Sequence, residues 1–282
     1  MLHMIKVYEI ITQKIIQQLE SGVIPWKQPW KTGIPQNLLS RKPYRGINAI
    51  LLGSLPFPSP YFLTFKQARL LDGYVRPGEK GIQIVFWNFI VDEESEEKRR
   101  LPFLRYYTVF NASQCNGIQI PTTPQLPFNE IEECERIVSE MPDAPKINYA
   151  ANYAAYSPVT DTVKIPARES FDTSQGFYST LFHELGHSTG HPSRLNRPGI
   201  TPDLTFGSSS YSKEELIAEL SSSFLCAKAG IVANTIANSA AYISGWLRAL
   251  KNDKRMIIAA AAQSQKASDY ILGIQFEAAT AE

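Results

Sequence analysis

Three of the four histidines of this chain lie within nine residues, in the segment STLFHELGHSTGH. His183 and His187 are four positions apart, so on a helix both imidazole rings leave the same face, one turn apart. Two ring nitrogens at this spacing can share one tetrahedral cation at about 2.0–2.1 Å. The segment is an H-E-x-x-H pattern, which works only on a helix, and we predict that helix over residues 174–189.

Glu184 follows the first histidine and can reach a water held at the site without itself being a ligand. It fits the general base that takes a proton from this water as the water attacks a carbonyl group. A catalytic zinc site of this type has three protein ligands and one open position. The pattern therefore predicts a metal-dependent hydrolase with Glu184 as the catalytic base.

A third histidine ligand is not expected. Metzincins place it six residues after the second histidine, where this chain has Ser193, and His191 comes too early. His191 lies just beyond Gly190, which we expect to end the helix, so capping or substrate contact suits it better than ligation.

The segment YSKEELIAEL, within a helix predicted over residues 212–228, is a better source of the third ligand. Glu215 and Glu219 lie four apart on one helical face, so one carboxylate can bind the metal while the other orients a histidine. We assign Glu215 as the ligand and Glu219 as its support, with the reverse assignment as the alternative. A solvated position suits Glu214 better.

Two further residues, Tyr211 and Arg194, are candidates to stabilise a tetrahedral oxyanion. The segment VKIPARESF, just before the histidine helix, is predicted to be a strand on which an extended peptide substrate could pair. Zn²⁺ suits the predicted ligand set, but imidazole and carboxylate groups also accept Mn²⁺ and other divalent ions.

Charge and aromatic content divide the chain in two. Residues 1–120 carry a net charge of +6 and just over half of the aromatic residues, whereas residues 121–282 carry −5. An acidic run, DEESEEKRR, is expected at the tip of a hairpin between two strands. We predict an α+β fold with two domains, residues 1–120 and 129–282, joined by a proline-rich linker at 121–128.

The first half interleaves aromatic residues with cations in PWKQPWK and RKPYRGIN, and YVRPGEKG adds cations on a glycine turn. Aromatic faces can stack on unpaired bases while cations follow the phosphates, so we expect a single-stranded nucleic acid as a partner. The alternative is that the tryptophans are core residues and the lysines ordinary surface. The predicted DNA contacts are Trp26, Lys27, Trp30, Lys31, Arg41, Lys42, Tyr44, Arg45, Arg76 and Lys80.

The remaining features argue against a secreted or membrane protein. The three cysteines are far apart and form no C-x-x-C pair, which indicates neither a disulfide framework nor a thiolate zinc site. The N-terminus is amphipathic rather than signal-like, and prolines interrupt INAILLGSLPFPSPYFL. We expect a cytoplasmic protein with no membrane partner.

Together these motifs resemble the ArdC family of plasmid and phage antirestriction proteins, and related proteins associated with conjugative primases. The resemblance runs nearly end to end. It rests on YRGIN, VRPGEKG and VFNASQ in the first half, and on LFHELGHSTGH, SRLNR, EELIAEL and AAYISGWLRALKNDKR in the second.

The resemblance implies a single-stranded-DNA-binding domain followed by a zincin-like, gluzincin-type metallopeptidase domain that together protect incoming DNA from host restriction. It carries the metal ligands over to His183, His187 and a glutamate of EELIAE, and the base to Glu184. It names no protein substrate, although the host restriction machinery is a plausible one. The alternative is a DNA-binding antirestriction protein whose metal site is structural or vestigial and cuts nothing.

Overall fold

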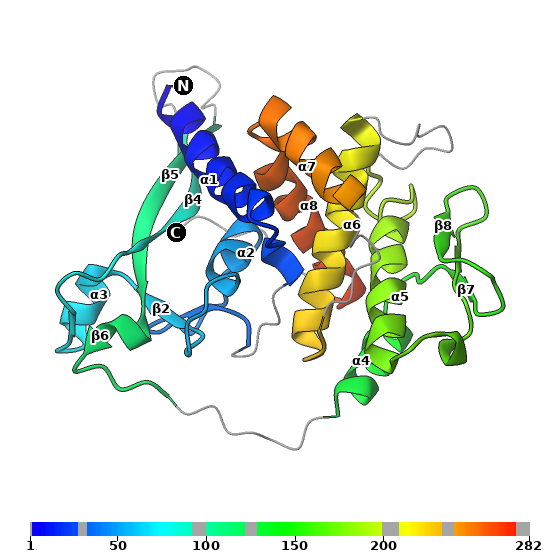
Figure 1. Ribbon diagram of the computed structural model, residues 1–282, viewed down its shortest axis with the longest axis horizontal. Helices are drawn as coiled ribbons and strands as arrows, with labels where there is room; N and C mark the ends of the chain where they lie inside the picture. Colours follow the sequence, from blue (N-terminus) through cyan, green and yellow to red (C-terminus); the bar gives the residue numbers. More distant parts are fainter. Residues whose placement is uncertain are drawn as a thin grey trace. The chain divides into compact units, whose positions relative to one another are not determined.

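The computed structural model describes residues 2–27, 33–91, 100–121, 129–198, 209–232 and 240–274. The chain divides into two compact units (Figure 1). Unit 1 comprises Met1–Pro25 and Ile34–Pro124, and unit 2 comprises Trp26–Gly33 and Gln125–Glu282. The predicted acidic hairpin tip and most of the predicted linker lie outside the described residues.

Unit 1 is an α+β structure built on a four-stranded sheet with strand order β1-β2-β5-β4 and a smaller pair, β3-β6. Its elements are α1 (Leu2–Glu20), β1 (Gln36–Asn37), α2 (Ile47–Gly53), β2 (Tyr61–Leu63), α3 (Phe65–Leu70), β3 (Tyr74–Val75), β4 (Ile82–Val91), β5 (Arg100–Asn111) and β6 (Cys115–Asn116). The hairpin predicted around the acidic run is confirmed as the antiparallel β4–β5 pair, and the amphipathic N-terminus is the helix α1.

The helices of unit 1 are fixed by apolar packing and by side-chain hydrogen bonds. α1 buries Ile11, Ile15 and Leu19 on one face, as its periodicity predicts. The short helix α2 was not predicted, because its INAILLG sequence is almost continuously apolar and shows no helical period. Asn48 of α2 donates to the carbonyl of Val85 and accepts from its amide, both at 2.7 Å, which covers the edge of β4.

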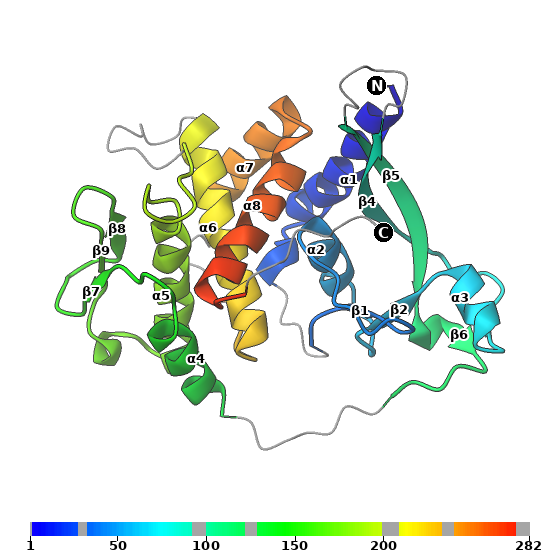
Figure 2. The ribbon, with the colours of Figure 1, turned by 180° about the vertical axis from the view of Figure 1, so that it is seen from behind.

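Unit 2 is mainly helical. Its elements are α4 (Glu130–Ser139), β7 (Lys146–Asn148), β8 (Ala155–Ser157), β9 (Thr162–Lys164), α5 (Ser174–Ser188), α6 (Ser209–Lys228), α7 (Ala240–Asn252) and α8 (Met256–Ile271). In both views α6 lies between α5 and α8, with the β7–β9 strands on the far side of α5 (Figures 1 and 2). The predicted histidine helix is confirmed as α5, whose N-cap Thr173 accepts a hydrogen bond from the amide of Gly176.

Small residues let the helices of unit 2 pack closely. A Cβ added to Gly186 of α5 would lie 3.1 Å from the Cβ of Ser221 and 3.2 Å from the Cα of Ala218, both on α6. Ser222 of α6 also donates a 2.8 Å hydrogen bond to the carbonyl of Ser179 on α5. This close approach brings the histidine face of α5 against α6.

Within the described ranges, no helix is both long and apolar enough to cross a membrane.

Candidate metal centre

The three predicted ligands converge between α5 and α6. The Nε2 atoms of His183 and His187 lie 3.1 Å apart, and each lies 3.6 Å from one carboxylate oxygen of Glu215. Donor atoms about 2.0–2.1 Å from a tetrahedral ion lie about 3.3 Å from one another. The observed separations bracket this value, so the three side chains fit a divalent cation. They are 11–15% exposed, which leaves the site open to small molecules.

Each histidine has a carboxylate behind its outward-facing nitrogen. The Nδ1 atom of His183 lies 3.7 Å from Oε1 of Glu219, and that of His187 lies 3.4 Å from Oε1 of Glu214. Carboxylates in these positions fix the tautomer and the orientation of a ligating ring and make it more basic. Two buried glutamates of α6 therefore hold the two rings of α5 with their Nε2 atoms facing each other.

The interpretation of Glu214 as a solvated residue is wrong. Its side chain is 4% exposed and pairs with the guanidinium of Arg197 at 2.6 Å. Burial raises the pKa of Glu214, but hydrogen bonds from His187 and Arg197 outweigh burial, and the net effect lowers that pKa. Glu214 is thus a buried carboxylate that links Arg197 to His187.

Arg197 is held in place by more than this ion pair. It also donates hydrogen bonds to the hydroxyl of Thr189 at 2.6 Å and to the carbonyl of Gly186 at 2.9 Å, at the end of α5. Sequence reasoning missed both Arg197 and the role of Glu214. Arg197 comes from the loop after α5, and no local pattern relates it to a residue of α6.

The charged groups of the site act strongly on one another. Burial lowers the pKa of His183, but contact with Glu215 and the charges of Glu219 and Glu184 outweigh it and raise the pKa to about 9. Burial raises the pKa of Glu215, yet its contact with His183, the charges of both histidines and a hydrogen bond from Tyr211 lower it to about 2. The ligand carboxylate is therefore ionised and faces a positively charged imidazole.

The structure places the predicted base Glu184 at the site. It neighbours His183 on α5 and is 5% exposed. Its charge is among those that raise the pKa of His183. Glu184 is thus a buried carboxylate close enough to His183 for its charge to act on that ring.

The three other candidates differ in position. Tyr211 forms a hydrogen bond with Glu215 and so lies next to the centre. His191 lies beyond the end of α5, where its Nδ1 atom is 2.7 Å from the hydroxyl of Ser193 and 3.2 Å from its amide nitrogen.

Arg194 does not fit the role of an oxyanion ligand. Its side chain is 1% exposed and forms an ion pair with Asp161. It also donates hydrogen bonds to the carbonyl oxygens of Ser188 at 2.7 Å and Asp143 at 2.8 Å. These contacts join the end of α5 to the loops around the small sheet, so the expectation from sequence is corrected to a structural role.

The predicted substrate-pairing strand is also corrected. Of VKIPARESF, only Val163 and Lys164 are strand, at the end of β9 (Thr162–Lys164), and Arg168–Ser170 is a 3₁₀ turn. β9 is the central strand of the sheet order β7-β9-β8, parallel to β7 and antiparallel to β8. Because both of its edges are already paired, β9 cannot add an extended peptide as a new strand.

Trp26 is not a base-stacking residue. It is 1% exposed and belongs to unit 2, where its ring lies 5.2 Å from that of Trp246. Its carbonyl accepts a 2.5 Å hydrogen bond from Ser223 of α6. The predicted contacts Trp30 and Lys31, and the side chain of Lys27, lie outside the described residues.

The other predicted DNA contacts belong to unit 1. Tyr44 is half-buried and forms a T-shaped contact with Phe62, with ring centroids 6.3 Å apart. Arg76 is paired with Glu79 at 2.5 Å. The exposed cations among the predicted contacts are Arg41, Lys42, Arg45 and Lys80.

A turn capped by Asn37 presents two of these cations. The Asn37 side-chain oxygen accepts hydrogen bonds from the amides of Leu39 and Ser40 at 3.1 and 2.9 Å. Arg41 follows in the left-handed region, with φ of 58°, and its guanidinium lies 5.0 Å from the centre of the Tyr61 ring. The turn therefore holds Arg41 and the adjoining Lys42 on the surface of unit 1.

Two family models match the chain, one in each unit. Residues 5–110 match the N-terminal domain of the anti-restriction factor ArdC. Residues 132–263 match a zincin-like metallopeptidase. The second match spans both helices that form the candidate metal centre.

Relatives match along nearly the whole chain. This chain is 34% identical over 292 aligned residues to a DNA primase TraC of Escherichia coli. The alignment covers 95% of this chain but only 20% of the primase. A second E. coli TraC is 33% identical and is covered to 27% of its length. The protein y4eC of Sinorhizobium fredii is 34% identical, with 96% of this chain and 93% of that protein covered.

Solved structures agree with this relation. The chain resembles the antirestriction protein ArdC of plasmid R388 in its metal-free crystal structure, with a TM-score of 0.77 and 36% identity over 94% of this chain and 96% of that one. The Mn(II)-bound structure of the same protein gives the same TM-score and identity over 95% and 97%. The chain therefore belongs to the ArdC family of antirestriction proteins.

Proposed function

We propose that this protein binds single-stranded DNA through unit 1 and cuts a protein with a metal-dependent peptidase site in unit 2. One observation carries the peptidase proposal. His183, His187 and Glu215 converge at separations suited to a divalent cation, with the carboxylate of Glu184 buried beside them. A site that only stabilised the fold would have no need of an additional carboxylate at that position.

In this proposal, His183, His187 and Glu215 hold Zn²⁺ or Mn²⁺, as Mn(II) is bound in the ArdC protein of plasmid R388. The bound cation would act as a Lewis acid that polarises a peptide carbonyl and makes water a better nucleophile. Glu184 accepts the proton of that water and passes it to the leaving amine. Tyr211, beside Glu215, is the candidate to donate a hydrogen bond to the oxyanion.

Unit 1 would hold the protein on the incoming strand. Its match to the ArdC N-terminal domain supports a DNA partner, and Arg41, Lys42, Arg45 and Lys80 are exposed cations suited to phosphate. A protein bound in this way would meet host restriction proteins at the DNA they attack. We propose that the peptidase substrate belongs to this machinery.

The test is Glu184→Gln, which keeps the shape of the side chain and removes its basicity. We expect unchanged metal content and unchanged affinity for single-stranded DNA. Metal-dependent peptide cleavage and protection of transferred DNA should fall by a factor of about 10²–10⁴. Glu169→Gln, at an exposed glutamate of the same unit, serves as the matched control and should retain both activities.

If Glu184→Gln protects transferred DNA as well as the natural protein does, the peptidase proposal is overturned. Protection would then come from occupation of the strand, with a metal site that only stabilises unit 2. Loss of protection in a variant that has also lost its metal would instead show that Glu184 supports the site.

A further inference from the structure

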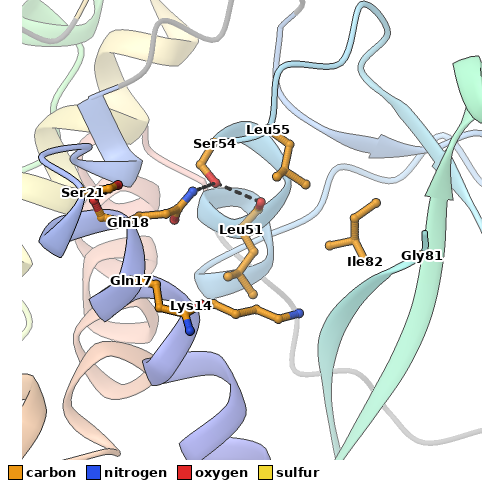
Figure 3. A pocket seen from close by; sticks show the side chains of 9 residues that line it. All are labelled: Lys14, Gln17, Gln18, Ser21, Leu51, Ser54, Leu55, Gly81 and Ile82. Carbon is orange, nitrogen blue, oxygen red and sulfur yellow. Dashed lines mark hydrogen bonds between the residues drawn. The ribbon is translucent and has the colours of Figure 1, made fainter. Parts of the chain in front are cut away.

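A pocket of unit 1 lies apart from the metal centre, between α1, α2 and the start of β4. Its volume is about 360 Å³, within the range of about 300–1,000 Å³ typical of small-molecule sites. Figure 3 shows side chains of α1 on one side, facing α2 and Ile82 of β4 on the other.

The two sides of the pocket differ in chemistry. Leu51, Leu55 and Ile82 form an apolar wall, whereas α1 contributes the amides of Gln17 and Gln18. The Gln18 amide nitrogen donates a 3.3 Å hydrogen bond to the hydroxyl of Ser54 on α2. Among the described residues, no hydrogen bond takes up the Gln18 side-chain oxygen or the Gln17 amide. These groups can therefore serve a ligand.

Lys14 is the charged residue of the pocket. Its side chain extends from α1 beneath Leu51 towards β4 (Figure 3). The lysine is half-buried, burial lowers its pKa, and none of the described residues forms an ion pair with it. An ammonium group partly removed from water and without a counter-ion is costly, and one anionic group beside it would stabilise it.

We propose that this pocket binds one nucleotide of a single DNA strand, with its phosphodiester on Lys14 and its base against the apolar wall. This inference rests on the proposed DNA binding of unit 1. A phosphodiester carries one negative charge, which matches one lysine, whereas the terminal phosphate of a free nucleotide carries about 1.5–2.

The amides give the pocket little preference for one base. Each carboxamide has both a donor and an acceptor, so Gln17 and Gln18 can bond to the edge of any base. Leu51, Leu55 and Ile82 would contact the flat face of the ring, which every base presents. The pocket thus suits a protein that follows a strand of arbitrary sequence.

The test uses the full-length protein and fluorescence anisotropy with a labelled oligothymidylate. Lys14→Met keeps most of the stem and removes the charge, and we expect affinity to fall about tenfold. The slope of log affinity against log salt should become shallower by about 0.7. Lys66→Met, at an exposed lysine of α3, is the matched control and should change affinity less than about twofold.

Ser21→Trp adds a test that does not alter charge. Ser21 is exposed at the end of α1 and lines the pocket, so a tryptophan there should fill the opening without disturbing the core. We expect an affinity loss of about tenfold with the salt slope unchanged. Thermal unfolding of each variant checks that the fold is retained.

Thymidine monophosphate, titrated as a competitor, shows whether the pocket binds a nucleotide within a DNA strand or a free nucleotide. The proposal holds if both pocket variants lose oligonucleotide affinity and the monophosphate does not displace the strand. It is overturned if the monophosphate binds in a Lys14-dependent manner while strand binding is unaffected. It is also overturned if the natural protein binds the strand and both variants bind it equally well. If the natural protein binds no strand at all, the proposed DNA binding itself fails.

Discussion

The two units hold their charged side chains in opposite ways. In unit 2 the charges around the candidate metal centre are enclosed and paired, as in Arg197–Glu214 with side chains 5% and 4% exposed. In unit 1 the cations of the Asn37-capped turn, Arg41 and Lys42, are exposed, and in the described part of the chain Lys14 has no ion-pair partner. A rigid, enclosed array suits a small cation of fixed coordination, whereas open cations suit a flexible polyanion. The difference supports the proposal that the two units bind different partners.

Trp26→Ala is the variant with the largest expected effect on this contrast between the units. This tryptophan precedes the strands of unit 1 in the chain but packs in unit 2. Removing a ring that is 1% exposed should lower the free energy of unfolding by about 3–5 kcal/mol. Affinity for single-stranded DNA should change less than about twofold while the protein stays folded. Denaturant unfolding and fluorescence anisotropy measure the two effects.

The matched variant is Lys42→Ala, which should show the reverse pattern. Its stability should stay within about 0.5 kcal/mol of the natural protein, since the side chain is exposed. Its DNA affinity should fall, and fall less at high salt. If Trp26→Ala weakens DNA binding and leaves stability intact, the separation of the two units by function is wrong.

A second prediction concerns the enclosed charges of unit 2. Glu214→Gln keeps the size of the side chain but removes the negative charge between Arg197 and His187. We expect Mn²⁺ affinity to fall about 10–100-fold, which corresponds to about 1.4–2.7 kcal/mol. Isothermal titration calorimetry measures the change, and Glu132→Gln, at an exposed glutamate of α4, is the control. Unchanged affinity would show that Glu214 does not orient His187.

The smallest expected effect is a proton released when the metal binds. The pKa of His183 is raised to about 9, so its imidazole is protonated at neutral pH in the metal-free protein. Glu215, with a pKa of about 2, is already ionised and releases no proton. Because a ligating imidazole must be neutral, metal binding should release the proton of His183, and apparent affinity should rise with pH up to about 9.

Calorimetry in two buffers of different ionisation enthalpy tests this release at neutral pH. Equal binding enthalpies in the two buffers would argue against it. An apparent affinity that stays constant between about pH 6 and 8 would do so as well, since a proton bound at His183 must compete with the metal over that range.

Local periodicity was enough to predict some parts of the molecule. The four-residue spacing of His183 and His187 requires a helix, and α5 has it. The acidic run between two β-rich segments predicts a hairpin, and β4 and β5 pair antiparallel on either side of it. Each of these features depends on residues close in the chain, so the sequence itself contains the signal.

The features that sequence reasoning missed depend on residues far apart in the chain. From its local sequence Glu214 looks solvated, because the contact that buries its charge comes from Arg197 in the loop after α5. Trp26 meets Trp246 of α7, which no pattern around PWKQPWK indicates. The central position of β9 depends on β7, which pairs with it from an earlier segment.

The metal content of the purified protein tests the central claim most directly. Natural protein and His187→Ala would be incubated with Zn²⁺ or Mn²⁺, freed of excess metal and measured by elemental analysis, with circular dichroism to confirm folding. We predict about one divalent ion per chain in the natural protein and almost none in His187→Ala, because His183 and Glu215 alone leave the site one ligand short. If neither protein retains metal, or if both retain it equally, His183, His187 and Glu215 do not form the metal centre of this protein.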